Sequence, residues 1–209
     1  MLRDIRKNYQ NFVLEEQHLT SSPMELFARW LKNAIENSEE EPTAMTLSTC
    51  IKGQPDSRIV LLKEVDDFSF VFFSNYLSIK GKQLAENNLV ALNFFWPKTE
   101  RQVRVWGAAE RLNEQQSALY FQSRPRDSQI GAWASPQSRE ISTREELDQN
   151  FTYYSELFKD KSISKPTNWG GYAVKPTEIE FWQGRPNRLH DRFRYYFREN
   201  CWQVKRLAP

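Results

Sequence analysis

Short runs of β-branched and aromatic residues dominate the sequence from residue 43 onward, and turn-forming residues separate them. These runs do not alternate regularly with helical segments, as they would in a parallel βαβ fold. The pattern therefore predicts a mainly β protein, an antiparallel barrel with helices on its outside. We expect strands at residues 43–51, 57–65, 68–74, 89–96, 101–112 and 170–183, and within 195–207.

Four segments have helical character instead. Ser22, Pro23 and Glu25 form the pattern of a capping box with proline at the first helical position, and an amphipathic run follows them. Further helices are expected at residues 78–87, 114–122 and 143–159. In the last of these the apolar residues share one stripe, which predicts packing in the core.

The length and charge of the chain limit its class. We expect one compact domain, residues 1–209, with residues 1–20 as a mobile N-terminal segment. The 29 basic and 27 acidic residues leave a net charge of +2, which argues against non-specific nucleic-acid binding. No apolar run has the length of a signal-peptide core or a membrane helix, so we expect a soluble, cytoplasmic protein with no membrane partner.

Metal and thiol chemistry find little support in the sequence. The two cysteines, Cys50 and Cys201, lie far apart, and His18 and His190 are the only histidines. Neither a zinc-binding pattern nor a nucleophile elbow is present, so we expect no metal site.

Cationic side chains gather at several places that could hold a phosphate. No glycine-rich phosphate loop is present, so side chains would have to bind any phosphate group. Taken singly, each is best explained as solvated surface, but together, around apolar β-structure, they suit a phosphorylated small molecule. The clusters contain Arg58, Lys63, Lys80, Lys82, Arg101, Arg104, Arg124 and Arg126.

Local geometry constrains two of these clusters. Arg58 and Lys63 are an odd number of residues apart, so they would point to opposite faces of one regular strand. Tyr120, Arg124 and Ser128 have helical spacing, but the proline that follows Arg124 disfavours helical geometry there. We therefore expect a helix end or a bend through which these three side chains converge.

The segment FWQGRPNRLHDRF concentrates cations between aromatic residues. It contains Arg185, Arg188 and Arg192 together with His190, and Asp191 is its only carboxylate. Two interpretations are open from the residues alone. The cations could form surface ion pairs with Asp191 and its neighbours, or they could bind anionic ligands.

Several motifs occur in the order typical of a known enzyme family. They are RIVLLK, RQVRVWG, YFQSRPRDSQIGAW, SPQS, EFWQGRPNRLHDRF and the terminal WQVKRLAP. From Tyr9 to Pro209 the chain resembles pyridoxine (pyridoxamine) 5′-phosphate oxidase. The resemblance implies an FMN-binding split β-barrel and a homodimer with the flavin at the subunit interface. Arg6 and Tyr9 resemble positions of an N-terminal segment that can cover the active site.

The resemblance also implies a reaction. Pyridoxine 5′-phosphate or pyridoxamine 5′-phosphate would be oxidised to pyridoxal 5′-phosphate by hydride transfer from C4′ to N5 of the flavin. Oxygen would then accept the electrons and give hydrogen peroxide. The amine substrate would give an imine that water hydrolyses, and the alcohol would give the aldehyde directly.

Functional residues follow from the resemblance, motif by motif. The grip on the substrate phosphate would consist of Lys63, Tyr120, Arg124 and Ser128. Arg188 and His190 would be the catalytic pair beside the substrate ring, and His190 could either donate a hydrogen bond or take up a proton. The implied FMN-binding positions are Arg58, Ile59, Val60, Leu61, Leu62, Lys63, Phe73, Ser74, Lys80, Gln102, Gln137, Ser138, Trp182 and Arg192.

One residue departs from the family pattern. Ile79 stands where the family usually has an arginine, at a position implied to contact the FMN phosphate. Loss of one charged hydrogen bond of about 1.5 to 3 kcal/mol would weaken FMN binding about 10- to 150-fold. Lys80 and Lys82 are candidates for compensation, so we expect a retained but weaker flavin site.

Two other functions remain as alternatives. A non-catalytic carrier or sensor on the same barrel could bind FMN or pyridoxal phosphate, and Ile79 is its main support. Arginines and aromatic residues on a β-surface could also bind single-stranded nucleic acid. The low net charge disfavours that second alternative.

Overall fold

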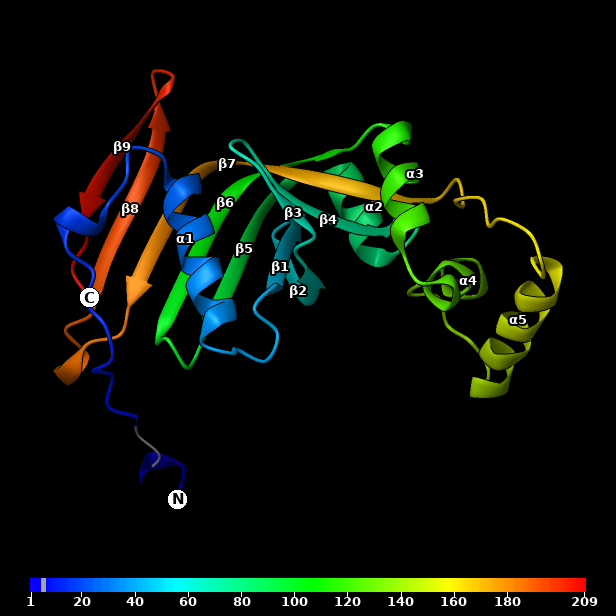
Figure 1. Ribbon diagram of the computed structural model, residues 1–209, viewed down its shortest axis with the longest axis horizontal. Helices are drawn as coiled ribbons and strands as arrows, with labels where there is room; N and C mark the ends of the chain where they lie inside the picture. Colours follow the sequence, from blue (N-terminus) through cyan, green and yellow to red (C-terminus); the bar gives the residue numbers. More distant parts are fainter. Residues whose placement is uncertain (5–6) are drawn as a thin grey trace.

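A nine-stranded antiparallel sheet forms the centre of the protein (Figure 1). The computed structural model describes residues 1–4 and 7–209. Along the main path the strand order is β2-β1-β5-β6-β7-β4-β3, while β8 pairs with β7 and β9 with β8. The two ends of this path are not paired with each other in the described residues, so the barrel is split rather than closed. The strands are β1 (Ala44–Ile51), β2 (Gln54–Leu61), β3 (Glu64–Val65), β4 (Phe70–Asn75), β5 (Leu89–Trp96), β6 (Arg101–Arg111), β7 (Trp169–Gln183), β8 (Asp191–Arg198) and β9 (Cys201–Arg206).

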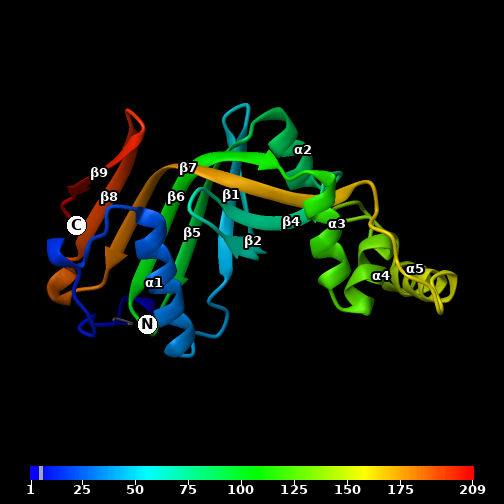
Figure 2. The same cartoon turned by 45° about the horizontal axis from the view of Figure 1, so that its top comes forward.

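Strand β7 is the longest strand and connects the two ends of the molecule (Figure 2). It pairs with β6 along its length, with β4 over its first part and with β8 over its last part. At about 3.3 Å per residue, Trp169 and Trp182 lie up to about 43 Å apart along the strand. Side chains at the two ends of β7 therefore lie far apart in space within one chain.

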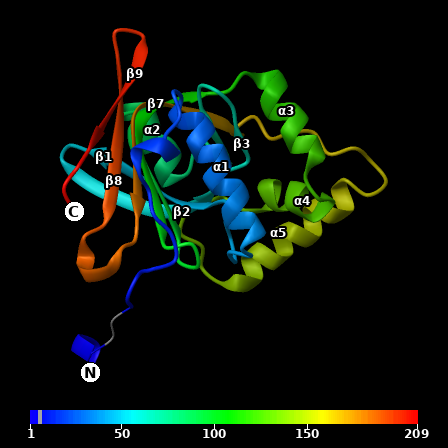
Figure 3. The same ribbon diagram turned by 60° about the vertical axis from the view of Figure 1, so that its left-hand side comes forward.

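Helix α1 (Pro23–Glu36) lies across one face of the sheet, as Figures 1 and 3 show. It begins where the sequence predicts, because the Ser22 side chain accepts a hydrogen bond from a backbone N–H of the first turn. Phe27 and Trp30 are buried and pack against aromatic side chains of β4, β5 and β7. The main hydrophobic core lies between this helix and the sheet.

Four further helices lie around the sheet: α2 (Ile79–Glu86), α3 (Glu114–Ser123), α4 (Arg126–Ala134) and α5 (Arg144–Leu157). Helices α3 to α5 gather at one end of the molecule, and the β8–β9 hairpin lies at the other end (Figures 1 and 2). A second, smaller core at the helical end is built around Phe121, Ile130, Ile163 and Trp169.

The sequence missed or misplaced some features of this helical end. Helix α4 was not predicted, although the bend expected near Arg124 is present, because α3 ends before it and α4 starts after Pro125. Helix α5 is present as predicted, but it buries no residue. Its apolar stripe packs instead on Trp133 of α4 through Tyr154, so it does not join the main core.

The C-terminal region predicted to be extended is a hairpin of two strands. Glu199 and Asn200 join β8 to β9, and both have positive φ angles, of 52° and 60°. Positive φ at both central residues is the geometry of a type I′ turn, which joins antiparallel strands tightly. The turn expected at Lys52 and Gly53 is also present, between β1 and β2.

Three short 3₁₀ turns complete the structure: η1 (Leu2–Asp4), η2 (Glu16–His18) and η3 (Pro186–Arg188). No helix in the described part of the chain is both long and apolar enough to cross a membrane. Arg6, one of the two N-terminal positions singled out by the resemblance, lies outside the described residues.

Candidate active site

A pocket of about 280 Å³ lies where β2, β4, α2 and α3 meet the start of β7. In the part of the chain that the structure describes, three cationic side chains, Lys63, Lys80 and Arg124, line it, and no carboxylate does. The remaining lining is apolar or neutral, so the pocket favours an anionic group. Every lining residue except Trp169 was predicted from the sequence: Ile59, Val60, Leu61, Lys63, Phe73, Ser74, Lys80, Tyr120, Arg124 and Gln137.

Arg124 reaches this pocket from the bend between α3 and α4. Its guanidinium lies 4.8 Å from the ring centre of Trp169, and its Nη1 is buried with no hydrogen-bond partner among the described residues. Burial lowers the pKa of Arg124 from its usual value and raises that of the neighbouring Tyr120. A buried N–H group without a partner is costly, so an acceptor on a bound anion would stabilise this arrangement.

Aromatic rings form the floor beside these cations. The rings of Phe73 and Tyr120 are stacked with centres 3.8 Å apart, and Trp169 lies parallel to Tyr120 with centres 6.2 Å apart. Trp169 was missed because no local motif marks it, and its position depends on pairing of β7 with β4 far away in the sequence.

Lys80 and Ser74 meet at Gln137. Lys80 Nζ and Ser74 Oγ both donate to Oε1 of Gln137, at 3.3 and 3.2 Å. Burial, followed by the charge of Arg58, lowers the pKa of Lys80. The structure therefore brings together three residues that the resemblance assigned to FMN.

Some predicted FMN and substrate residues do not line the pocket. Arg58 binds Thr49, Asp56 and Gln83, and Leu62 is buried in the main core. Ser128 lies in the first turn of α4, and Ser138 is exposed with a φ of 68°.

A second group of predicted residues lies at the far end of β7. Gln102, Trp182 and Arg192 are directly paired across β6, β7 and β8, so they form one row on one face of the sheet. Arg192 donates from Nε and Nη2 to Oε1 of Glu180, at 2.9 and 2.8 Å. Glu180 is 2% exposed and was not predicted, because this contact depends on pairing between β7 and β8.

His190 lies beside this row. Its ring centre is 4.6 Å from that of Trp182, and its Nδ1 accepts a hydrogen bond from the backbone N–H of Arg185 at 3.1 Å. Burial, and then the charge of Arg188, lowers the pKa of His190 below its ordinary value. An imidazole that accepts at Nδ1 carries its proton on Nε2, so His190 presents a hydrogen-bond donor. Arg188 is exposed, with a φ of 62°.

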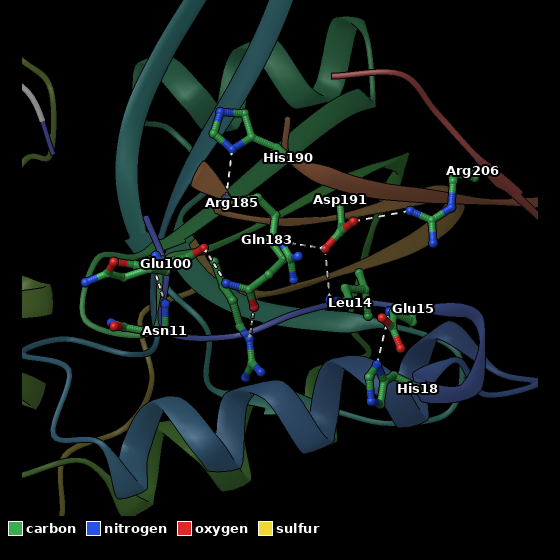
Figure 4. Close-up of polar contacts among 12 residues, drawn as sticks. Asn11, Leu14, Glu15, His18, Glu100, Gln183, Arg185, His190, Asp191 and Arg206 are labelled. Atoms are coloured by element: carbon green, nitrogen blue, oxygen red, sulfur yellow. Dashed lines mark hydrogen bonds and ion pairs between the residues drawn. The ribbon is translucent and has the colours of Figure 1, made fainter. Parts of the chain in front are cut away.

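The N-terminal segment is bound along this end of the sheet, as Figure 4 shows. The buried carboxylate of Glu100 accepts hydrogen bonds from the backbone N–H groups of Gln10 and Asn11, at 2.8 and 3.0 Å. Asp191 accepts from the backbone N–H of Leu14 at 3.1 Å.

These bonds hold Tyr9 against the second group. The Tyr9 ring packs edge-on against Trp182 and His190, with ring centres 5.6 and 5.8 Å away. Gly184 leaves room for it, because a Cβ atom there would lie 2.6 Å from Tyr9 Cγ.

Two family models match the chain. The model described as "Pyridoxamine 5'-phosphate oxidase" matches residues 31–158. The model described as "Pyridoxine 5'-phosphate oxidase C-terminal dimerisation region" matches residues 169–209. The matched regions include both groups of candidate site residues, so the family expected from the sequence motifs is confirmed.

Individual relatives agree with these matches. The pyridoxine/pyridoxamine 5′-phosphate oxidase of Haemophilus ducreyi is 50% identical to this chain, and the alignment covers 100% of this chain and 99% of the relative. The enzyme of the same name from Cyanothece sp. is 48% identical, and the alignment covers 100% of this chain and 98% of the relative. The structure of PhzG from Burkholderia lata in complex with tetrahydrophenazine-1-carboxylic acid has a TM-score of 0.89 at 30% identity, covering 94% of this chain and 98% of that one. The structure of an FMN-binding protein of Nostoc punctiforme has a TM-score of 0.69 at 14% identity, covering 88% of this chain and 97% of that one. It shares the fold, which confirms the predicted split barrel. The chain belongs to the pyridoxamine 5′-phosphate oxidase family.

Proposed function

We propose that this protein is an FMN-dependent oxidase that converts pyridoxine 5′-phosphate and pyridoxamine 5′-phosphate to pyridoxal 5′-phosphate, with oxygen as electron acceptor. The observation that supports this most directly is the carboxylate-free pocket in which Lys63, Lys80 and Arg124 converge beside an aromatic stack. Relatives that match the whole chain carry this activity in their names. FMN is the cofactor, as the resemblance to the family implied.

The pocket residues fit two phosphate groups. Lys80 and Ser74 now donate to a neutral amide oxygen, and a phosphate oxygen of FMN would be a stronger acceptor for both. Lys63, Tyr120 and Arg124 would hold the substrate phosphate, and the unpartnered Nη1 of Arg124 would gain an acceptor. When bound, FMN supplies the acceptor for the hydride that leaves C4′ of the substrate, and the reduced flavin would pass the electrons on to oxygen.

The substrate must be fixed at both ends for this transfer. A phosphate held by Lys63 and Arg124 would anchor one end of the small ring, and Arg188 with His190 would contact the other. Within one chain these two groups lie at opposite ends of β7, up to about 43 Å apart along the strand. We therefore propose that the second group comes from a partner subunit, with FMN at the interface of a two-fold dimer. The match of residues 169–209 to a dimerisation region supports this arrangement.

His190 would act as a hydrogen-bond donor to a substrate oxygen rather than as a base. Its Nδ1 lone pair is occupied by the Arg185 N–H, and the proton lies on Nε2. This contact favours the positioning role among the two left open by the sequence.

The neutral state of His190 has a pH dependence that can be measured. Its lowered pKa means that the neutral form, and the bond from Arg185, are present above that pKa and lost as pH falls through it. We expect the imidazole of His190 to titrate below the ordinary histidine value of about 6.5. Nuclear magnetic resonance (NMR) titration, with the signal assigned by loss in His190→Gln, checks this. A midpoint at or above 6.5 would contradict the assignment.

Ile79→Arg should tighten FMN binding. Ile79 is 53% exposed at the first position of α2, directly before Lys80, so an arginine there could reach a phosphate in the pocket. One added charged hydrogen bond predicts about 10- to 150-fold tighter binding in a flavin fluorescence titration. Leu89→Arg, at an exposed residue of β5, adds the same charge elsewhere and should leave the affinity unchanged. Unchanged or weaker binding in Ile79→Arg would refute the proposed role of this position.

The oxidase function is tested by the visible spectrum of the FMN-loaded protein without oxygen. Addition of pyridoxine or pyridoxamine 5′-phosphate should bleach the flavin, and air should restore the colour as pyridoxal 5′-phosphate appears. Bound flavin that neither substrate bleaches would indicate the alternative, a non-catalytic carrier.

A further inference from the structure

A second cavity, of about 570 Å³, lies between the N-terminal segment, helix α1 and the start of β6. Its volume is within the range of about 300 to 1,000 Å³ that is usual for small-molecule sites. It shares no lining residue with the candidate active-site pocket. Of the residues that the structure describes, His18, Arg29 and Arg101 line it together with three side-chain amides, and no carboxylate does.

Arg101 is the most unusual residue of this cavity. Its Nε donates to Oε1 of Gln183 at 2.9 Å and its Nη1 to Oδ1 of Asn33 at 2.8 Å, and both partners are neutral. Its guanidinium lies over the rings of Phe12 and Trp30, at 4.8 and 4.4 Å from their centres. Burial, and then the charge of Arg29, lowers the pKa of Arg101 to about 10. Among the described residues Arg101 has no carboxylate partner, although a buried charge is normally paired.

The other two side chains add donors to the same cavity. Arg29 donates to the backbone oxygen of His18, which ties its guanidinium to the segment that carries His18. Nδ1 of His18 accepts from the backbone N–H of Glu15 at 3.0 Å (Figure 4), so its proton lies on Nε2 and is available to a ligand.

Three carboxylates that lie close to His18 or Arg101 in the sequence have other partners. Glu15 accepts from the side chain of Gln17, Glu16 binds Arg206, and Glu100 binds the backbone of the N-terminal segment. None of the three lines the cavity, so the charges of Arg29 and Arg101 are left for a ligand.

We propose that this cavity binds the oxyanion of a small molecule, a phosphate ester or a carboxylate, through Arg29, Arg101 and the Nε2–H of His18. Charge-assisted hydrogen bonds to an oxyanion would give Arg101 the charged partner that the protein does not supply. Residues 10–14 form one wall of the cavity, and the same segment leads to Tyr9 beside His190. A ligand in the cavity would therefore also stabilise the segment that packs on the second group of candidate site residues.

The two histidines of the chain allow a direct test. Imidazole NMR signals of the FMN-loaded protein, labelled at histidine, report on this cavity through His18 and on the candidate active site through His190. Inorganic phosphate and acetate are titrated separately at constant ionic strength. The proposal predicts a saturable shift of the His18 signal, and the anion that saturates at lower concentration identifies the ligand class.

Two charge-neutralising variants of α1 make the test specific. Arg29→Gln should weaken the anion affinity measured at His18 by about 10- to 150-fold. Lys32→Gln removes an exposed charge from the same helix outside the cavity and should leave the affinity unchanged. Because Arg29 is exposed, Arg29→Gln should fold, and an unchanged His190 signal without anion verifies this. No saturable shift of His18 with either anion, or equal affinity in Arg29→Gln, would overturn the proposal.

Discussion

Replacement of both Lys63 and Arg124 by glutamine should lower kcat/KM for pyridoxine 5′-phosphate by at least about 100-fold, since each charged hydrogen bond contributes about 1.5 to 3 kcal/mol. Both side chains line the carboxylate-free pocket, and the buried Nη1 of Arg124 has no partner among the described residues. The phosphate would then lose its two strongest donors, and the ring would no longer be held in position for hydride transfer. Steady-state kinetics at saturating FMN measure the effect.

A substrate without a phosphate separates this effect from general damage. Turnover of unphosphorylated pyridoxine should be slow in both proteins and similar in the double variant and the parent. Arg126→Gln is the matched control, because Arg126 donates to backbone oxygens of Phe158 and Lys161 outside the pocket. An equal loss of activity on both substrates would show that Lys63 and Arg124 do not recognise the phosphate.

Gly107→Ala should destabilise the fold by at least about 3 kcal/mol, at the upper end of overpacking effects. Gly107 is buried at the bulge between β6 and β7, and a Cβ atom there would lie 2.1 Å from the backbone oxygen of Lys175. A backbone oxygen paired in the sheet cannot move aside as a flexible side chain can. Denaturant unfolding followed by fluorescence measures the change in the free energy of unfolding.

A second glycine gives the control for this prediction. Gly131 lies in α4, and a Cβ atom there would meet nothing within 4 Å. Gly131→Ala should therefore stabilise the protein by about 0.5 to 1 kcal/mol, because alanine loses less backbone entropy in a helix. Similar stability of the Gly107→Ala variant and the parent would mean that β6 and β7 are not this close at the bulge.

Local sequence signals predicted most of the fold because they act over a few residues. Ser22 and Pro23 mark the start of α1, and runs such as LVALNFFW define strands that the structure confirms. Helix α4 was missed because it is short and follows a proline, and the β8–β9 turn was missed because neither Glu199 nor Asn200 is a glycine. The packing of α5 depends on which neighbour covers it, which no local pattern contains.

The candidate site was predictable chiefly through the family motifs. The pocket combines β2, β4, α2, α3 and β7, so spacing along the chain does not reveal that Lys63, Lys80 and Arg124 meet. The contacts of Trp169 and Glu180 depend on strand pairing over long sequence distances, and both residues were missed. The hydrogen bond that places the proton of His190 on Nε2 is likewise visible only in the structure.

Subunit complementation tests the central claim most directly, namely that one active site combines the pocket of one chain with Arg188 and His190 of another. Arg124→Gln and a double variant, Arg188→Gln with His190→Gln, should each be nearly inactive alone. In mixed dimers one of the two sites would be intact, so random mixing should restore about one quarter of the parental sites. Arg124→Gln mixed with Lys63→Gln, which alters the same pocket, should restore nothing. Recovery of the oxidase activity to about one quarter of the parental activity, in the first mixture alone, would support the shared site. Activity no higher than that of the separate variants would contradict it.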